Sequence, residues 1–153
     1  MLKIYNLADR LEFLDEICDL TLKEWGSYSE DEYDSRIAKK KDKILNNLDN
    51  KYYCKLILLD GDNLVGFISL FPTDGDERSD LSPWYATMYV KKEYRGKGYS
   101  KILNDAILNE ARNRGFSKVY LKSELKNYYE KFGAIYMEDL NNGEKLYYID
   151  LKK

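Results

Sequence analysis

The chain has 153 residues, of which 44% are hydrophobic, 34% are charged and two are prolines. This composition excludes a fibrous or disordered chain and predicts one compact domain over residues 1–153. The net charge of −2 excludes the strong positive field of a non-specific nucleic-acid binder, so we expect no nucleic-acid partner.

Histidine is absent from the sequence, which excludes the usual general base, the Ser–His and Cys–His nucleophile pairs and His-containing zinc sites. We therefore expect no metal centre, and proton transfer by Asp, Glu, Tyr or water. Apolar stretches such as 64–71 are far shorter than the roughly 20 residues of a membrane span, which predicts no membrane partner. The first residues lack a signal-peptide pattern, so we expect a cytoplasmic protein in which Cys18 and Cys54 are buried free thiols.

Helical periodicity dominates the first third of the chain. Apolar residues recur at three- and four-residue steps over 7–25, which predicts an amphipathic helix that starts near the N-terminus and ends near Gly26. Ser29 is a suitable N-cap for a second helix over about 30–48, where acidic residues come early and lysines late.

The middle of the chain changes to strand-like patterns. Two apolar runs, 53–59 and 64–71, flank an Asp-Gly-Asp-Asn turn and predict a hairpin. A third strand follows over 84–90, and a third helix runs to about Arg114, with Gly115 at its C′ position.

The last segment is predicted as a short strand at 119–121, a helical turn at 128–132 and a final hairpin. The hairpin strands are 134–137 and 145–151, around an Asn-Asn-Gly turn. The order of elements favours an α+β fold, a mostly antiparallel central sheet with flanking helices.

The richest segment, 90–101, joins the third strand to the third helix. Gly96 and Gly98 remove side chains where a ligand would touch the main chain, and the free N–H groups of the following helix favour an anion. Five cationic residues against Glu93 favour phosphate: Lys91, Lys92, Arg95, Lys97 and Lys101.

Two motifs carry a family resemblance. Residues 95–100 (Arg-Gly-Lys-Gly-Tyr-Ser) resemble the Arg/Gln-x-x-Gly-x-Gly/Ala signature of the GNAT superfamily of N-acetyltransferases, with Ser100 in place of the last Gly or Ala. Residues 128–133 (Tyr-Tyr-Glu-Lys-Phe-Gly) resemble the family's Tyr-Glu-Lys-Leu-Gly-Phe segment, with Ala134 where Phe is frequent. The element order also agrees, so the resemblance covers essentially the whole chain.

The resemblance implies a GNAT-like fold with a splayed pair of strands, at about 85–90 and 118–122, and the pantetheine of acetyl-coenzyme A between them. Backbone groups of the first strand would bond the pantetheine, and amides of the glycine loop would hold the pyrophosphate. The coenzyme-binding residues implied are Met88, Tyr89, Val90, Arg95, Gly96, Lys97, Gly98, Tyr99 and Ser100.

The activity implied is acetyl transfer to an amine, with Tyr129 as general acid for the departing thiolate and a strand amide near Met88 polarising the carbonyl. Because the chain has 15 tyrosines, packing is the alternative role for Tyr129. The resemblance does not locate the general base. Asp80 is the first candidate and Glu77 the next, with a water relay or a merely solvated acidic turn as alternatives.

The acidic stretch around Asp74, Asp76, Glu77 and Asp80 would attract a cationic small-molecule or peptide amine, such as a polyamine, aminoglycoside-like, lysine-like or N-terminal amine. Trp25 and Trp84 are interpreted as core or rim packing, with lining of the acceptor pocket as the alternative role. A non-catalytic acyl-coenzyme A sensor or partner module is the alternative function. A homodimer is possible, and the sequence identifies neither the acceptor nor the oligomeric state.

Overall fold

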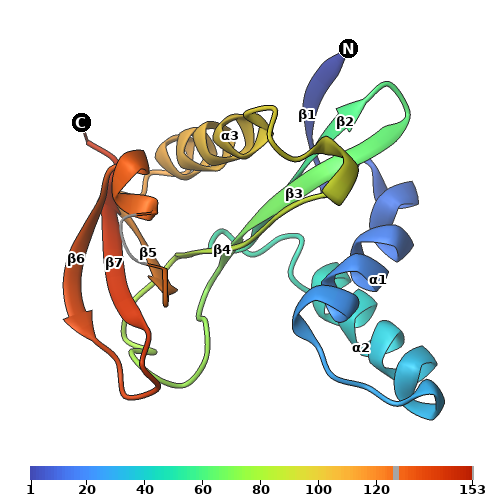
Figure 1. Cartoon of the computed structure of the whole chain (residues 1–153), viewed down its shortest axis with the longest axis horizontal. Helices are drawn as coiled ribbons and strands as arrows, with labels where there is room; N and C mark the ends of the chain where they lie inside the picture. The colour runs from blue at the N-terminus through green and yellow to red at the C-terminus, as the bar shows by residue number, and fades with distance from the viewer. Residues whose placement is uncertain (126–127, 153) are drawn as a thin grey trace.

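The computed structural model describes residues 1–125 and 128–152, in which seven strands form a sheet ordered β1-β2-β3-β4-β5-β7-β6 (Figure 1). All neighbouring strands are antiparallel except β4 and β5, which are parallel. The strands are β1 (Leu2–Asn6), β2 (Cys54–Asp60), β3 (Asn63–Phe71), β4 (Trp84–Val90), β5 (Lys118–Ser123), β6 (Ala134–Asp139) and β7 (Lys145–Asp150). The helices are α1 (Leu14–Trp25), α2 (Tyr33–Leu45) and α3 (Tyr99–Asn113), and a 3₁₀ turn, Tyr129–Phe132, precedes β6. The predicted α+β fold with a mostly antiparallel sheet is confirmed.

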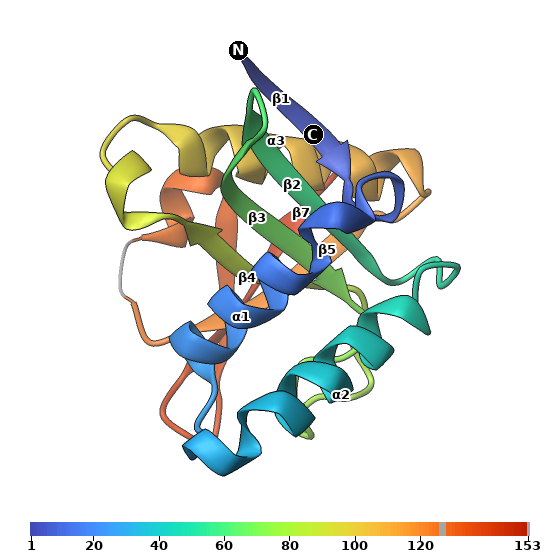
Figure 2. The same ribbon diagram turned by 90° about the vertical axis from the view of Figure 1, so that its right-hand side faces the viewer.

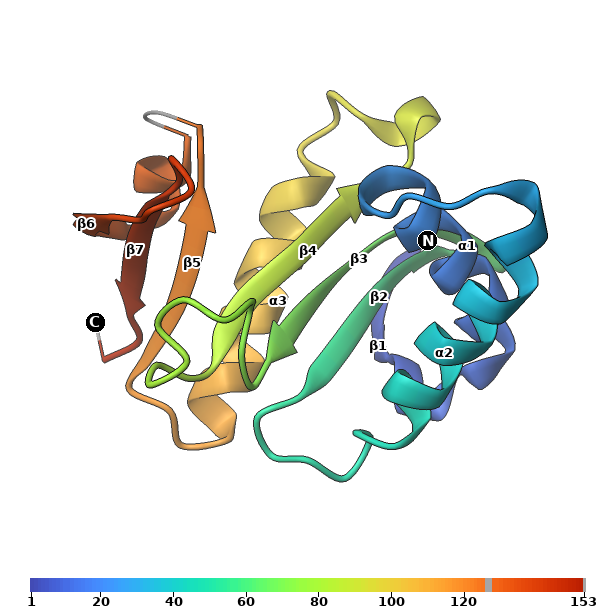
Figure 3. The same cartoon turned by 90° about the horizontal axis from the view of Figure 1, so that it is seen from below.

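Helices cover both faces of the sheet. The side chains of β2 alternate between them: Leu56 and Leu58 join the cluster under α3, and Ile57 and Leu59 join the cluster under α1 and α2. Figure 2 shows α1 and α2 lying across one face, and Figure 3 shows α3 behind the opposite face. Because both faces are buried, β2 and β3 appear in the sequence as continuous apolar runs.

Strand β1 was not predicted, and the first helix was predicted to start too early, since its apolar stripe was taken from Leu7 and α1 begins at Leu14. Residues 2–6 form β1, which pairs with β2 and places Leu2 and Ile4 against the core. The side-chain oxygen of Asn6 then accepts a hydrogen bond from the backbone N–H of Ala8 (2.9 Å), and two 3₁₀ turns precede α1. The strand has only five residues, so its alternating pattern is a weaker signal than the helical periodicity of the apolar residues that follow.

Several local signals are confirmed. Ser29 lies at the N-cap position of the turn leading into α2, and its backbone N–H donates to the Glu32 side chain. Gly115 follows α3 with a φ of +88°, as a C′ glycine should. Cys18 and Cys54 are free and buried. Trp84 is buried in the core, where its Nε1–H donates to the carbonyl of Leu81 (2.9 Å).

The two parallel strands diverge in the middle of the sheet. Trp84 pairs with Tyr120 near the start of β4, and beyond this pair β4 and β5 separate (Figure 3). This is the splayed pair that the family resemblance implied. Within the described residues, no helix combines the length and apolarity that membrane crossing requires.

We expect Gly66→Ala to lower the free energy of unfolding by about 2 kcal/mol, because an added Cβ on β3 would collide with the carbonyl oxygen of Tyr89 and lie 3.2 Å from Leu103. Urea unfolding measures this effect. Gly61→Ala is the control, since Gly61 has open space around it and a φ of +62°, so that only backbone strain of about 1 kcal/mol is added. Equal losses in the two variants would show that the close strand approach is unimportant.

Candidate functional site

A cavity of about 540 Å³, here named the loop cavity, lies beside the glycine loop. It is bounded by the end of β4, the loop, the start of α3, and side chains from α1 and the segment after β5. Its lining residues are Glu24, Met88, Tyr89, Val90, Tyr94, Arg95, Gly96, Gly98, Tyr99, Ser100, Leu125 and Tyr128. Eight of the nine residues predicted to bind coenzyme therefore line it, and Lys97 does not; its ammonium lies 5.9 Å from the Tyr94 ring.

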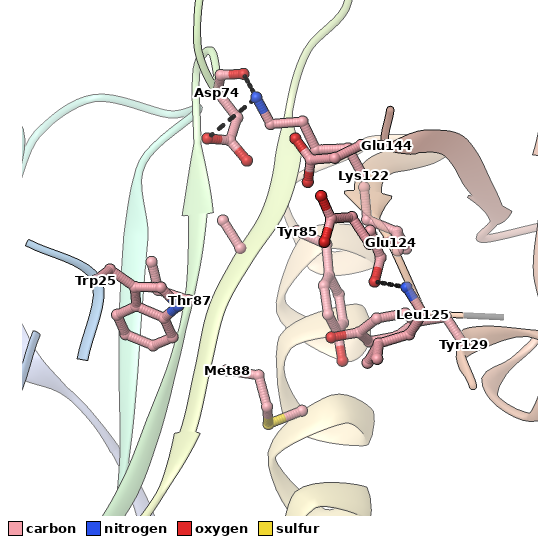
Figure 4. Close-up of a pocket in the computed structure, with 13 residues that line it drawn as sticks. Trp25, Asp74, Tyr85, Thr87, Met88, Lys122, Glu124, Leu125, Tyr129 and Glu144 are labelled. Atoms are coloured by element: carbon pink, nitrogen blue, oxygen red, sulfur yellow. Dashed lines mark hydrogen bonds and ion pairs between the residues drawn. The ribbon is translucent and has the colours of Figure 1, made fainter. Parts of the chain in front are cut away.

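A second cavity of about 550 Å³, here named the gap cavity, lies between the diverging strands (Figure 4). Its lining residues are Trp25, Asp74, Tyr85, Ala86, Thr87, Met88, Leu121, Lys122, Ser123, Glu124, Leu125, Tyr129 and Glu144. Met88 and Leu125 line both cavities. The two spaces therefore adjoin, one at each end of the separation between β4 and β5.

The glycine loop presents unpaired donors to the loop cavity. Gly98 is the N-cap of α3 with a φ of +80°, and no side chain caps this helix end or places an acid in its first turn. Gly96 has a φ of +79°, a conformation that costs little only for glycine. The Arg95 side chain is oriented by its Nε–H, which donates to the Val90 carbonyl (2.8 Å). Free N–H groups, a helix N-terminus and an arginine together form a site for an anion such as phosphate.

Strand β4 contains a bulge where the cavities meet. The pairing with β3 shifts between Phe67 and Ser69, and Thr87 adopts a φ of +49°, which a β-branched residue rarely does. A bulge leaves a residue outside the ladder and turns backbone groups away from the neighbouring strand. Main-chain donors near Met88 are therefore available to polarise a carbonyl in the gap cavity.

Tyr129 lies on the wall of the gap cavity opposite β4 (Figure 4). Its ring packs edge-on against Tyr85, with centroids 6.0 Å apart, and against Tyr128, at 4.7 Å. Burial, and secondarily the neighbouring Tyr128, raises the pKa of the Tyr129 phenol. The hydroxyl therefore stays protonated through neutral pH, as a proton donor must.

The carboxylates predicted as general base lie elsewhere. Two hydrogen bonds of 3.0 Å join the Asp80 carboxylate to Arg78, and the hydrogen bonding to Arg78 lowers the Asp80 pKa. Glu77 accepts a hydrogen bond from the backbone N–H of Asn141 (2.9 Å). Neither is among the described residues lining the gap cavity. Of the acidic stretch, Asp74 is among the described residues that line the gap cavity, whereas Asp80 and Glu77 lie outside that lining.

Three carboxylates do line the gap cavity: Asp74, Glu124 and Glu144. Lys122 faces them; its ammonium donates to the Asp74 backbone carbonyl (2.6 Å) and lies 4.0 Å from Oδ1. Burial raises the pKa of Asp74, and the effect of Lys122 opposes it. Among the described lining residues, three carboxylates face one cation, a balance that favours a positively charged guest.

Sequence reasoning missed Glu124 and Glu144, which lie 20 residues apart. They lie close together because β5 and β7 are antiparallel, with Ser123 opposite Lys145. Glu124 directly follows β5 and Glu144 directly precedes β7, and both line the gap cavity. For Trp25, the sequence favoured packing over a place in the acceptor pocket. Its ring stands 49% exposed, packs edge-on against Tyr89 (6.1 Å) and lines the gap cavity. No signal in one sequence indicates these pairings between distant segments.

Among the described residues, no group of three or more His, Cys, Asp or Glu is arranged to hold a metal ion.

Known proteins that are similar to this chain are acetyltransferases. A model of the acetyltransferase (GNAT) family matches residues 14–134. N-alpha-acetyltransferase 30 of Schizosaccharomyces pombe is 29% identical over 103 residues, covering 61% of this chain and 68% of that protein. The PaiA N-acetyltransferase of Thermoplasma acidophilum, solved in complex with coenzyme A, superposes with a TM-score of 0.71 at 23% identity, covering 98% of this chain and 99% of that one. A dodecameric spermidine N-acetyltransferase of Vibrio cholerae has a TM-score of 0.71 at 19% identity, covering 99% and 95%.

Proposed function

Because this chain belongs to the acetyltransferase (GNAT) family, we propose that it transfers the acetyl group of acetyl-coenzyme A directly to a primary amine of a small molecule or peptide. It is an acyltransferase whose acyl donor is acetyl-coenzyme A. The observation on which the proposal rests is the meeting of the loop cavity and the gap cavity at Met88. Donor and acceptor can therefore reach one point from opposite ends of the strand separation.

The donor occupies the loop cavity in this proposal. The pyrophosphate lies against the backbone N–H groups of residues 96–100, where the helix dipole and Arg95 favour negative charge. The pantetheine extends along β4, whose edge is unpaired beyond Trp84, and its amides bond to the backbone of Met88 and Val90. This arrangement directs the thioester toward the gap cavity.

The transfer is a direct displacement. The neutral amine nitrogen attacks the thioester carbon, and the resulting oxyanion is stabilised by main-chain donors at the bulge near Met88. The carbon–sulfur bond then breaks, and the departing thiolate takes the proton of the Tyr129 hydroxyl. The nitrogen loses its extra proton to a base, so that acetylated amine and free thiol are released.

The base is Asp74 in this proposal, acting directly or through water. Its carboxyl lines the gap cavity, and burial raises its pKa, which makes the carboxylate a stronger proton acceptor. We prefer Asp74 to Asp80, because Asp80 is bonded to Arg78 and is not among the described residues that line the cavity. Glu124 and Glu144 then serve to attract the acceptor as its ammonium form.

Assembly and location stay predictions. The edge strand β6 exposes three consecutive apolar side chains, Ile135, Tyr136 and Met137, and a homodimer would cover them. The dodecameric spermidine N-acetyltransferase is a fold neighbour that assembles. Reaction in the cytoplasm is consistent with two free buried thiols.

We expect Tyr129→Phe to lower kcat by about 100-fold, because the thiolate then leaves without a positioned proton. Steady-state release of free thiol from acetyl-coenzyme A, measured over a panel of amines, tests this. Tyr136→Phe is the matched control, since Tyr136 is 51% exposed on β6 and lines neither cavity. Unchanged kcat in Tyr129→Phe would restrict Tyr129 to packing.

The pH dependence of kcat tests Asp74. Because burial raises its pKa, the wild-type activity should fall as pH decreases through a value above 3.9, the usual carboxyl value, as the base becomes protonated. Asp74→Asn should abolish this acidic limb and lower kcat by about 100-fold. Asp80→Asn should keep the limb. Loss of the limb in Asp80→Asn, with Asp74→Asn unaffected, would contradict the assignment.

The glycine loop is tested by coenzyme affinity. Gly98→Ala should raise the Kd of coenzyme A at least about tenfold, because alanine disfavours the φ of +80° and the N–H groups of the loop shift. Gly143→Ala is matched, since Gly143 has a φ of +91° and, like Gly98, no atom within 4 Å of an added Cβ, but lies in the β6–β7 turn. Isothermal titration calorimetry should find wild-type affinity in Gly143→Ala. Equal affinities in both variants would refute the proposed pyrophosphate site.

A further inference from the structure

A third cavity, here named the lysine cavity, adjoins the gap cavity on the side of α1 and α2. It has a volume of about 190 Å³ and shares Trp25 and Thr87 with the gap cavity. Lys40 and Lys43 line it from α2, and Lys55 lines it from β2. None of the described lining residues is acidic, so three cations face one small space with no carboxylate among them.

Lys55 is the unusual member of this group, because its side chain is only 4% exposed. Its ammonium donates to the Ser69 hydroxyl (2.6 Å) and lies 5.3 Å from the Phe67 ring and 5.4 Å from the Phe71 ring. These contacts solvate the charge partly but do not neutralise it. A buried lysine without a counter-ion is costly, and its retention is more typical of a binding or catalytic site than of a packed core.

The buried ammonium is linked to the gap cavity by hydroxyl groups. Ser69 accepts from Lys55 and also from the hydroxyl of Thr87 (2.7 Å), the bulge residue that lines both cavities. The strained Thr87 therefore stands at the boundary between a region of three carboxylates and a region of three lysines. A molecule that spans this boundary meets negative charge at one end and positive charge at the other.

We propose that the lysine cavity binds an anionic group of the acceptor, a carboxylate or a phosphate, so that the acceptor is a primary amine that also carries an anion. This inference rests on the proposed function, because the amine end is assigned to the gap cavity. The acidic residues Asp74, Glu124 and Glu144 attract the ammonium, and the lysines hold the anion across Thr87. The same lysines repel the second ammonium of a diamine or polyamine.

The charge state of Lys55 agrees with this geometry. Burial lowers its pKa to about 8, and the nearby Lys40 and Lys43 add to the lowering, whereas Cys18 and Cys54 oppose it. At neutral pH the group is still largely protonated. A bound anion relieves both causes of the lowered pKa, since it replaces lost solvation and neutralises the neighbouring lysines.

The kinetic test compares primary amines of equal chain length that end in a carboxylate, a phosphate, a methyl group or a second ammonium. We expect kcat/KM for the better anionic amine to exceed that of the methyl-ended amine about tenfold or more, with the diamine the poorest. Lys55→Met should abolish the preference, so that anionic and methyl-ended amines have equal kcat/KM in this variant. Comparison of the carboxylate-ended and phosphate-ended amines identifies which anion the lysine cavity prefers.

The matched control is Lys39→Met, which removes the same charge from an exposed position of α2 outside the cavity lining and should keep the preference. If Lys55→Met fails to fold, Lys40→Met and Lys43→Met, at more exposed positions, should each reduce the preference. Equal kcat/KM for anionic and methyl-ended amines in the wild type would overturn the inference and leave the proposed function standing.

A binding arm separates the two proposals. Alkyl carboxylate and alkyl phosphate, both without an amine, are titrated into the unmodified full-length chain and into Lys55→Met by calorimetry at constant ionic strength. Saturable binding that Lys55→Met abolishes supports the inference even if no amine releases thiol, a result that would refute only the proposed function. Absence of binding by either anion in the wild type, together with no kinetic preference, overturns the inference.

Discussion

The separation of β4 from β5 is the constraint on which the site depends. The two strands are joined at Trp84 and Tyr120, and the cluster of Trp84, Leu140 and Leu146 fixes that end of the sheet. Helix α3 packs on one face of the sheet, where its side chains share a buried cluster with residues of strands on both sides of the separation. Because strand edges are rows of donors and acceptors, an opened sheet offers ordered backbone groups to a ligand without requiring particular side chains.

At the bulge, Thr87 adopts a backbone conformation that is unfavourable for a β-branched residue. A β-branched residue with positive φ costs about 1–2 kcal/mol, and it persists only when surrounding contacts hold it. Here Ser69 accepts the Thr87 hydroxyl and Lys55 bonds to the same oxygen. The strained backbone, the hydroxyl pair and the buried lysine therefore form one connected unit. Natural sequences place such conflicts at functional sites, and this unit lies between two cavities.

Features that the sequence predicted correctly are local. They are positions whose backbone conformation only a few residue types adopt easily. Examples are Gly98 at the N-terminus of α3, Gly115 after its C-terminus and the two hairpin turns. The missed features depend on distant pairing. Asp80 is prominent in the sequence, yet Arg78, two positions away, occupies its carboxylate and also contacts Glu138 on β6. Strand β1 could be predicted only with its partner β2 in view, because five residues are too few to show a clear strand-like alternation of apolar and polar side chains.

Positive and negative side chains are separated into different regions of the fold, although the net charge of the chain is only −2. The glycine loop and the lysine cavity are positive, and between them the gap cavity holds three carboxylates against Lys122. Such alternation follows from strand geometry: Lys55 and Ser69 face the α1 and α2 side of the sheet, while Glu124 and Glu144 lie at the paired ends of β5 and β7. In the proposed function, substrates are sorted by the spacing of their charges, which depends on the splayed strands rather than on the overall composition.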